Sequence, residues 1–184
     1  AKQLYGDDMD RLWGDFLAVP QDNVHVLKGG ERVSLGDREL EVAYIPGHAS
    51  HHVGFLDRSS GVAFVGDTAG VRIGGELFAM PPTPPPDIDI VTWKASIAQI
   101  ERWQAKTLFL THFGPHENPA AHLASLVEHL DGMALLARSI MEQDATEEER
   151  AALFTVEFGR YVRRHMPDKA AALYDEAAPF SQCW

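Results

Sequence analysis

The feature that most constrains how this chain folds is a set of three short polar stretches, each directly after an apolar run typical of a β-strand. They are Gly-His-Ala-Ser-His-His at 47–52, Gly-Asp-Thr at 66–68 and Thr-His-Phe-Gly-Pro at 111–115. Glycine and proline end strands and begin loops, so each stretch places a histidine or an aspartate on a loop at a strand end. Proteins commonly build their sites on such loops.

His48, Asp67 and His112 are the candidate metal ligands in these stretches. Imidazole and carboxylate groups suit zinc, manganese or iron, and a neutral histidine binds a metal through one ring nitrogen while the other is held in place. On its own, Asp67 would be interpreted as a turn residue. An ionised aspartate can bridge two cations, however, so its combination with the two histidines favours a metal site.

Two further histidines, His51 and His52, begin the apolar run that follows the first stretch. Neighbouring residues of a strand point to opposite faces, so at most one of them can aim at the same site. We predict that this residue is His52, and that it contacts the substrate or supports a metal ligand.

The other histidines receive structural interpretations. His25 lies in an alternating apolar run, where a half-buried or exposed structural residue is expected. His116 is interpreted as a loop residue, and His122 and His129, seven residues apart on one expected helix, are interpreted as surface residues.

Hydrophobic periodicity predicts strands and helices that alternate along the chain. Strands are expected at 24–27, 32–35 and 39–45 as a meander, and then at 52–57, 61–65 and 107–110. Helices are expected at 7–17, at 89–104 with Asp89 as N-cap, at 118–142 with Asn118 as N-cap, at 147–166 after a capping box at Thr146, and after Pro167. This alternation predicts a layered α/β fold.

The glycine- and proline-rich loop at 69–86 has two interpretations that the sequence leaves open. It either forms a wall of a substrate pocket or is a semi-rigid surface connection. Its single cation, Arg72, is interpreted as solvated in preference to binding a substrate anion.

Composition narrows the class of partner. The formal net charge of -11 argues against nucleic-acid and anionic-membrane surfaces, because phosphate binding depends on clustered Lys and Arg. No apolar run reaches the roughly 18 residues of a membrane helix, and the single cysteine, Cys183, excludes an internal disulfide and a cysteine metal cluster. We therefore expect a small-molecule substrate and, by default, a cytoplasmic location.

In this order and after strands, the three polar stretches resemble the last three metal motifs of the metallo-β-lactamase superfamily. The resemblance extends from the meander to about residue 130. It implies an αββα sandwich with a two-metal site at the edge between its sheets, in which His48 ligates the first ion, His112 the second, and Asp67 bridges them. Members with aspartate at the bridging position resemble glyoxalase II and lactonases, whereas true β-lactamases carry cysteine there.

One motif of that family is absent. The sequence His-x-His-x-Asp-His, which supplies two ligands to each metal, does not occur, and residues 1–46 contain only His25. The chain is therefore expected to be the C-terminal half of the sandwich, a single incomplete domain at 1–184 with sheet and site loops to about 117 and C-terminal helices at about 118–184. The expected partner is the missing N-terminal half, and an uncovered sheet would also allow a homo-oligomer.

Together these features predict a metal-dependent hydrolase that cleaves an ester, thioester or lactone through a metal-bound hydroxide. Asp67 and His52 are the predicted catalytic residues, and the cofactor is two divalent ions, with zinc favoured over manganese or iron. The alternative is a catalytically inactive, metal-free half-domain that acts as a binding or scaffold module.

Overall fold

The computed structural model describes residues 8, 11–12, 14–15, 17–83 and 87–183, and its centre is a six-stranded sheet in the order β1-β2-β3-β4-β5-β6. The strands are β1 (Arg32–Leu35), β2 (Arg38–Tyr44), β3 (Val53–Asp57), β4 (Val62–Gly66), β5 (Thr107–Leu110) and β6 (Pro115–Glu117). The first four form an antiparallel meander, β5 is parallel to β4, and β6 is antiparallel to β5. A parallel pair needs a crossover, which a helix between β4 and β5 provides.

Helices α3 to α6 begin where the sequence provides a capping residue or a proline. They are α3 (Ile90–Arg102), α4 (Pro119–Met141), α5 (Glu147–His165) and α6 (Asp168–Ala177), with short 3-10 turns η2 (Gln21–Asn23), η3 (Asp67–Ala69) and η4 (Phe180–Cys183). Asp89 accepts a hydrogen bond from the Thr92 amide at the start of α3, and Thr146 forms the expected capping box with Glu149 at the start of α5. The caps predicted from the sequence are therefore confirmed.

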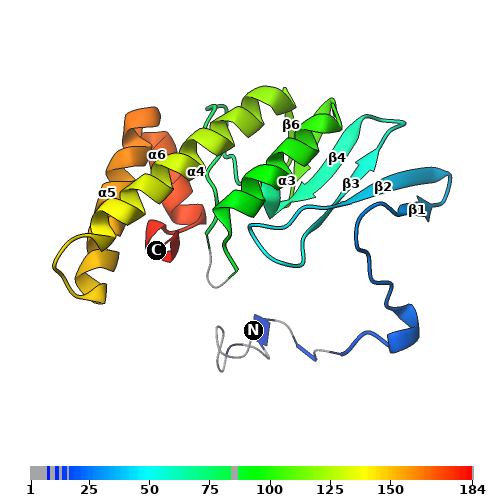
Figure 1. The fold of residues 1–184 in the computed structure, drawn as a ribbon, viewed down its shortest axis with the longest axis horizontal. Helices are drawn as coiled ribbons and strands as arrows, with labels where there is room; N and C mark the ends of the chain where they lie inside the picture. The colour runs from blue at the N-terminus through cyan, green and yellow to red at the C-terminus, as the bar shows by residue number, and fades with distance from the viewer. Residues whose placement is uncertain (1–7, 9–10, 13, 16, 84–86, 184) are drawn as a thin grey trace.

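Helices α3 and α4 lie side by side over one face of the sheet, while α5 and α6 pack at the far end of α4 (Figure 1). The strands alternate, so Ala63 and Val65 point to the helices and are fully buried. The main core joins this sheet face to Trp93, Ile97 and Ile100 of α3 and to α4.

A second core lies between the C-terminal helices and the loop after η3. Phe78 and Met80 are buried there against Phe158 and Tyr174, whereas Ala79 between them belongs to the main core. Residues 78–80 are therefore not a surface connection, because they are shared by both cores.

The face of the sheet opposite α3 and α4 is apolar, and in the part of the chain that the structure describes it is partly exposed, although Val42 on it is buried. Tyr44, Phe64 and Phe109 are 48%, 39% and 42% exposed on it. The rings of Phe64 and Phe109 lie 5.5 Å apart, and Phe55 is in register with Phe64. Single exposed apolar residues are ordinary, but a contiguous aromatic row usually marks an interface.

Two expected elements differ from the structure or lie outside it. Residues 24–27 form no strand: Val24 and Val26 are 43% and 75% exposed, and ladder bonding to β2 begins only near Gly30. His25 is correspondingly an exposed residue outside any strand. Of the helix expected at 7–17, five of the eleven residues lie outside the described ones; among the rest, residues 11 and 12 are helical, whereas residues 14, 15 and 17 are not.

Three histidines were placed wrongly by sequence reasoning. His122 and His129 are 0% and 2% exposed, because α4 packs on the sheet side at one of its ends and on α5 at the other. His116 lies in β6 and not in a loop. Met141, expected to point inward, is 55% exposed at the end of α4.

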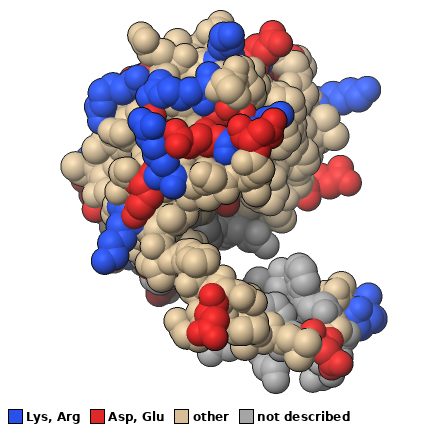
Figure 2. Space-filling view, turned by 90° about the vertical axis from the view of Figure 1, so that its right-hand side faces the viewer, with Lys and Arg blue, Asp and Glu red and all other residues tan. Residues whose placement is uncertain are grey.

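Charges of both signs are interleaved on the surface at the β1 and β2 end of the molecule (Figure 2). Arg32 pairs with Glu39 at 2.9 Å and Arg58 with Glu41 at 2.7 Å. Arg32 and Arg58 are therefore used in ion pairs. Within the described part of the chain, none of the helices is both long enough and apolar enough to cross a membrane.

Candidate metal centre

The three polar loops meet at one edge of the sheet, where β2, β4 and β5 end. His48 Nε2 lies 3.8 Å from Asp67 Oδ2, and His112 Nε2 lies 3.6 Å from Asp67 Oδ1. Each oxygen of the carboxylate therefore faces a different histidine. The structure thus brings together three residues that are far apart in the sequence.

His48 is held in one orientation by its second ring nitrogen. It is 8% exposed, and its Nδ1 lies 2.9 Å from the carbonyl oxygen of Pro82. A carbonyl only accepts hydrogen bonds, so Nδ1 carries the hydrogen and the lone pair is on Nε2, the atom that faces Asp67. This is the arrangement in which a histidine binds a metal.

The loop that carries His48 is pressed against the start of α3. Gly47 has φ +124°, and a Cβ built on it would lie 2.3 Å from the Trp93 Cα, so only glycine fits. The Gly47 carbonyl accepts from the Asp89 amide at 2.9 Å, and the Ser96 hydroxyl donates to the Pro46 carbonyl at 2.6 Å. The helix therefore fixes the backbone on both sides of the turn.

Asp67 leaves β4 through Gly66, whose φ of +58° is in the left-handed region, and begins the 3-10 turn η3. Thr68 anchors this turn, since its hydroxyl donates to the Ile45 carbonyl at 2.8 Å and its own carbonyl accepts from the Trp93 indole at 2.6 Å. Trp93 thus touches the supports of both Asp67 and His48.

The other end of η3 is held by a buried histidine. His122 Nε2 donates to the Ala69 carbonyl at 2.7 Å, and burial lowers the pKa of His122 to about 4. Its Nδ1 is buried without a hydrogen-bond partner, and its ring stacks on His116 at 5.5 Å. His122 is therefore neutral at neutral pH and serves as a fixed donor to the turn that carries Asp67.

His52 lies beside His48, with their rings 5.1 Å apart. His48, His52 and Asp67 each offer one ligand atom within 4.8 Å of the others. His52 Nδ1 lies 3.2 Å from the Thr68 hydroxyl, which already donates to a carbonyl, so Nδ1 donates and the lone pair is on Nε2. Burial, and then His48, lower the pKa of His52 and favour the neutral ring.

His112 is the most open member of the group, with 57% of its side chain exposed. It lies between β5 and β6, directly before Phe113, which has φ +65°. The neighbouring His51 is exposed and contacts the ring of His52. Of the two adjacent histidines, His52 is thus the one grouped with His48 and Asp67.

The donor set fits divalent metal ions. Two atoms bound to one tetrahedral zinc at about 2.1 Å are about 3.4 Å apart. The histidine-to-carboxylate distances of 3.8 and 3.6 Å are within a few tenths of an ångström of this separation. Two imidazoles and a carboxylate with one oxygen toward each are ligands that zinc, manganese and iron accept.

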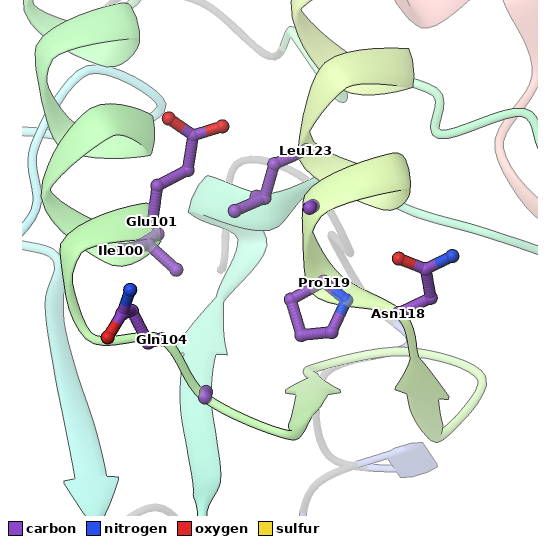
Figure 3. A pocket seen from close by; sticks show the side chains of 8 residues that line it. Ile100, Glu101, Gln104, Asn118, Pro119 and Leu123 are labelled. Carbon is purple, nitrogen blue, oxygen red and sulfur yellow. The ribbon is translucent and has the colours of Figure 1, made fainter.

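A separate pocket of about 370 Å³ lies between α3 and α4 (Figure 3). Its lining includes Gln104 and Ala105 before β5, and Asn118 and Pro119 after β6. It is therefore at the opposite end of β5 from His112, and no residue of the metal centre lines it.

Several supporting residues of the centre could not be recognised from the sequence. The Pro82 contact uses a backbone carbonyl, for which no side-chain signal exists. Trp93 was expected only as a core residue, and His122 as a surface residue. Thr68 was the one detectable supporter, because it belongs to the Gly-Asp-Thr stretch.

Comparison with known proteins gives related sequences. The family model of the metallo-beta-lactamase superfamily matches residues 2–112. The metallo-beta-lactamase fold-containing protein ST1585 of Sulfurisphaera tokodaii is 33% identical over 114 residues, covering 62% of this chain and 42% of that protein. The hydroxyacylglutathione hydrolase of Maricaulis maris is 34% identical over 79 residues, covering 39% of this chain and 31% of that protein.

Solved structures give the same fold. ST1585 aligns with a TM-score of 0.54 at 29% identity, over 72% of this chain and 48% of that chain. The metallo-beta-lactamase family protein TTHA1429 of Thermus thermophilus aligns with a TM-score of 0.57 at 19% identity, over 85% and 46%, which shows the fold alone. The chain thus spans less than half the length of these relatives. Its α/β fold is confirmed, and the chain belongs to the metallo-β-lactamase superfamily.

Proposed function

We propose that this chain supplies part of the two-metal site of a hydrolase. His48 holds the first ion, His112 holds the second, and Asp67 bridges them. The observation that carries the proposal is the Asp67 carboxylate, whose two oxygens face two different histidines at 3.8 and 3.6 Å. Zinc is the favoured ion, because imidazole and carboxylate are its usual ligands after thiolate.

The proposed substrate is an ester, thioester or lactone. The relatives named hydroxyacylglutathione hydrolase favour a thioester, but they match only about two fifths of this chain. When bound, the ions supply an activated water and polarise the substrate oxygen. The chain would hold the ligand side chains in fixed orientations. The Pro82 carbonyl fixes His48, and the anchored turn η3 fixes Asp67.

His52 is proposed to act beside the ions as a contact to the substrate. Its Nδ1 is used by Thr68, so the Nε2 lone pair is left to accept a proton or a hydrogen bond. Its lowered pKa keeps the ring neutral near pH 7, as a group that accepts a proton must be.

The chain alone offers too few ligands for two ions. His48, Asp67 and His112 are three residues, whereas catalytic sites generally keep three protein ligands for each zinc. We assign the missing ligands to an N-terminal half of the same fold, which would pack on the aromatic sheet face of Phe64 and Phe109. The coverage of less than half of each relative supports this assignment.

The test uses the chain joined to its preceding sequence. We expect about two zinc ions per complex by elemental analysis, together with hydrolysis of a glutathione thioester or a lactone. His48→Ala and Asp67→Asn should each reduce metal affinity by about tenfold to 100-fold or more and reduce hydrolysis correspondingly. His25→Ala, an exposed histidine outside the centre, is the control and should change neither quantity.

Fewer than one metal ion per complex, or full activity of both variants, contradicts the proposal. The metal-free scaffold alternative then remains, and it predicts a stable, monodisperse protein whose unfolding does not respond to chelators.

A further inference from the structure

A second group of metal-ligating side chains lies outside the candidate metal centre, where α4 packs on α5. Glu128 and His129 come from α4 and His165 from the end of α5. Each offers one ligand atom, and these atoms lie within 4.8 Å of one another. His129 is buried, whereas Glu128 and His165 are exposed.

Tyr161 holds both histidine rings through two different groups. Its backbone carbonyl accepts from His165 Nδ1 at 2.8 Å, and its hydroxyl lies 2.9 Å from His129 Nδ1. The two imidazole rings are 4.8 Å apart and nearly perpendicular at 81°. Because the Nδ1 atom of each ring is used by Tyr161, the Nε2 atoms are left as ligand atoms, which is how proteins commonly orient metal-binding histidines.

The buried histidine is also fixed by packing. The His129 ring lies 4.0 Å from the ring of Phe78, which is 1% exposed in the second core. A ligand held this firmly loses little freedom when it binds an ion, so one member of the group is preorganised. Glu128 and His165 have exposed side chains and can adjust to it.

We propose that Glu128, His129 and His165 form a second zinc site that ties α4 to α5. The two imidazoles and one carboxylate would leave the fourth tetrahedral position to water. Ligand atoms about 2.1 Å from a tetrahedral zinc lie about 3.4 Å apart. Separations of up to 4.8 Å therefore have to close by up to about 1.4 Å when the ion binds, through side-chain shifts of the exposed Glu128 and His165.

The types of ligand atom decide which cation fits. A hard cation such as magnesium or calcium prefers an all-oxygen site and gains little from imidazole. Zinc binds imidazole directly, which makes it the cation that this ligand set favours.

The experiment separates this site from the candidate metal centre. The 184-residue chain is made with His48→Ala and Asp67→Asn, so that the first site is removed, and is titrated with zinc against a competing chelator. We expect one zinc per chain and a rise in the unfolding midpoint, because an ion bound only to the folded state stabilises it. Cobalt(II) in place of zinc should give the visible absorption of a tetrahedral nitrogen and oxygen site.

In the same background, His165→Ala and Glu128→Gln should each weaken zinc binding by about tenfold or more and reduce the midpoint shift. Both residues are exposed, so the variants should fold. His25→Ala is the matched control and should bind zinc as the background does. Absence of zinc binding in the background, or equal affinity after His165→Ala, overturns the proposal without bearing on His48 and Asp67.

Discussion

At the scale of single residues, His122 is a buried histidine that holds the turn carrying Asp67. It is fully buried, donates to the Ala69 carbonyl, and has its pKa lowered from 6.5 to about 4 because burial disfavours the charged ring. Between about pH 6.5 and 4 the unfolded chain binds a proton on this residue that the folded chain does not. Stability therefore falls as the pH falls through this window, by about 3 kcal/mol in full.

His122→Gln tests this contribution. A glutamine amide can donate to the same carbonyl but does not titrate, so the free energy of unfolding should depend less steeply on pH between 6.5 and 4. The measurement is urea unfolding at several pH values with a chelator present. His129, whose pKa is also lowered to about 4, keeps part of the remaining dependence, together with His52 and His116, whose pKa values are lowered as well. An unchanged slope would show that His122 is charged or exposed in the folded protein.

The sequence could predict the role of a residue where the signal for that role is local, and not where the role depends on contacts with residues distant in the sequence. His48, Asp67 and His112 were found because each follows a strand end next to glycine or proline, a local signal. The burial of His122 and His129 was missed because their partners, Ala69 and Tyr161, are distant in the sequence. Seven-residue spacing on a helix shows only that they share one face.

At the scale of elements, the start of α3 supports the loop of His48. The Asp89 carboxylate accepts hydrogen bonds from the Thr92 amide at 2.9 Å and from the Thr92 hydroxyl at 2.8 Å, and these bonds lower the pKa of Asp89. The Asp89 amide donates to the Gly47 carbonyl. Asp89→Ala should therefore lower the free energy of unfolding at neutral pH, whereas Asp89→Asn keeps an acceptor and should lower it much less.

Chemical denaturation at pH 7 measures both variants. Asp144→Ala, an exposed aspartate outside any helix, is the control and should stay within about 0.5 kcal/mol of the parent. The loss in Asp89→Ala should shrink as the pH falls below the ordinary aspartate pKa, because the uncharged carboxyl is a poorer acceptor. Equal stability of Asp89→Ala and Asp144→Ala at pH 7 would contradict the capping role.

Elements were predicted well where the local signal was complete. The α3, α4 and α5 boundaries follow from capping residues and apolar stripes, and residues 107–110 form the expected strand. Residues 24–27 alternate as a strand does, yet they have no neighbouring strand to pair with, and strand formation depends on such a partner. The order of the strands in the sheet also depends on the pairing of β4 with β5, and no local sequence pattern predicts that pairing.

At the scale of the whole molecule, the sheet face opposite α3 and α4 carries an aromatic row that is partly exposed. Phe55, Phe64 and Phe109 are in register on neighbouring strands, and Phe64 and Phe109 are 39% and 42% exposed. Burying one such ring is worth about 1.5–3 kcal/mol, so isolated chains, without the proposed N-terminal half, should bury the row against each other. We therefore expect the 184-residue chain to self-associate as its concentration rises.

Replacing two of these rings by charges should remove that tendency. Phe64→Lys combined with Phe109→Lys places like charges side by side on the face, which opposes burial against a second copy and leaves the helix-covered core untouched. Light scattering after size exclusion should show the parent as a concentration-dependent oligomer and the double variant as a monomer. Leu173→Lys, an exposed apolar position on α6 away from the sheet, should behave as the parent does. A parent chain that stays monomeric at every concentration would show that this face needs no cover, and would remove the structural support for a missing half.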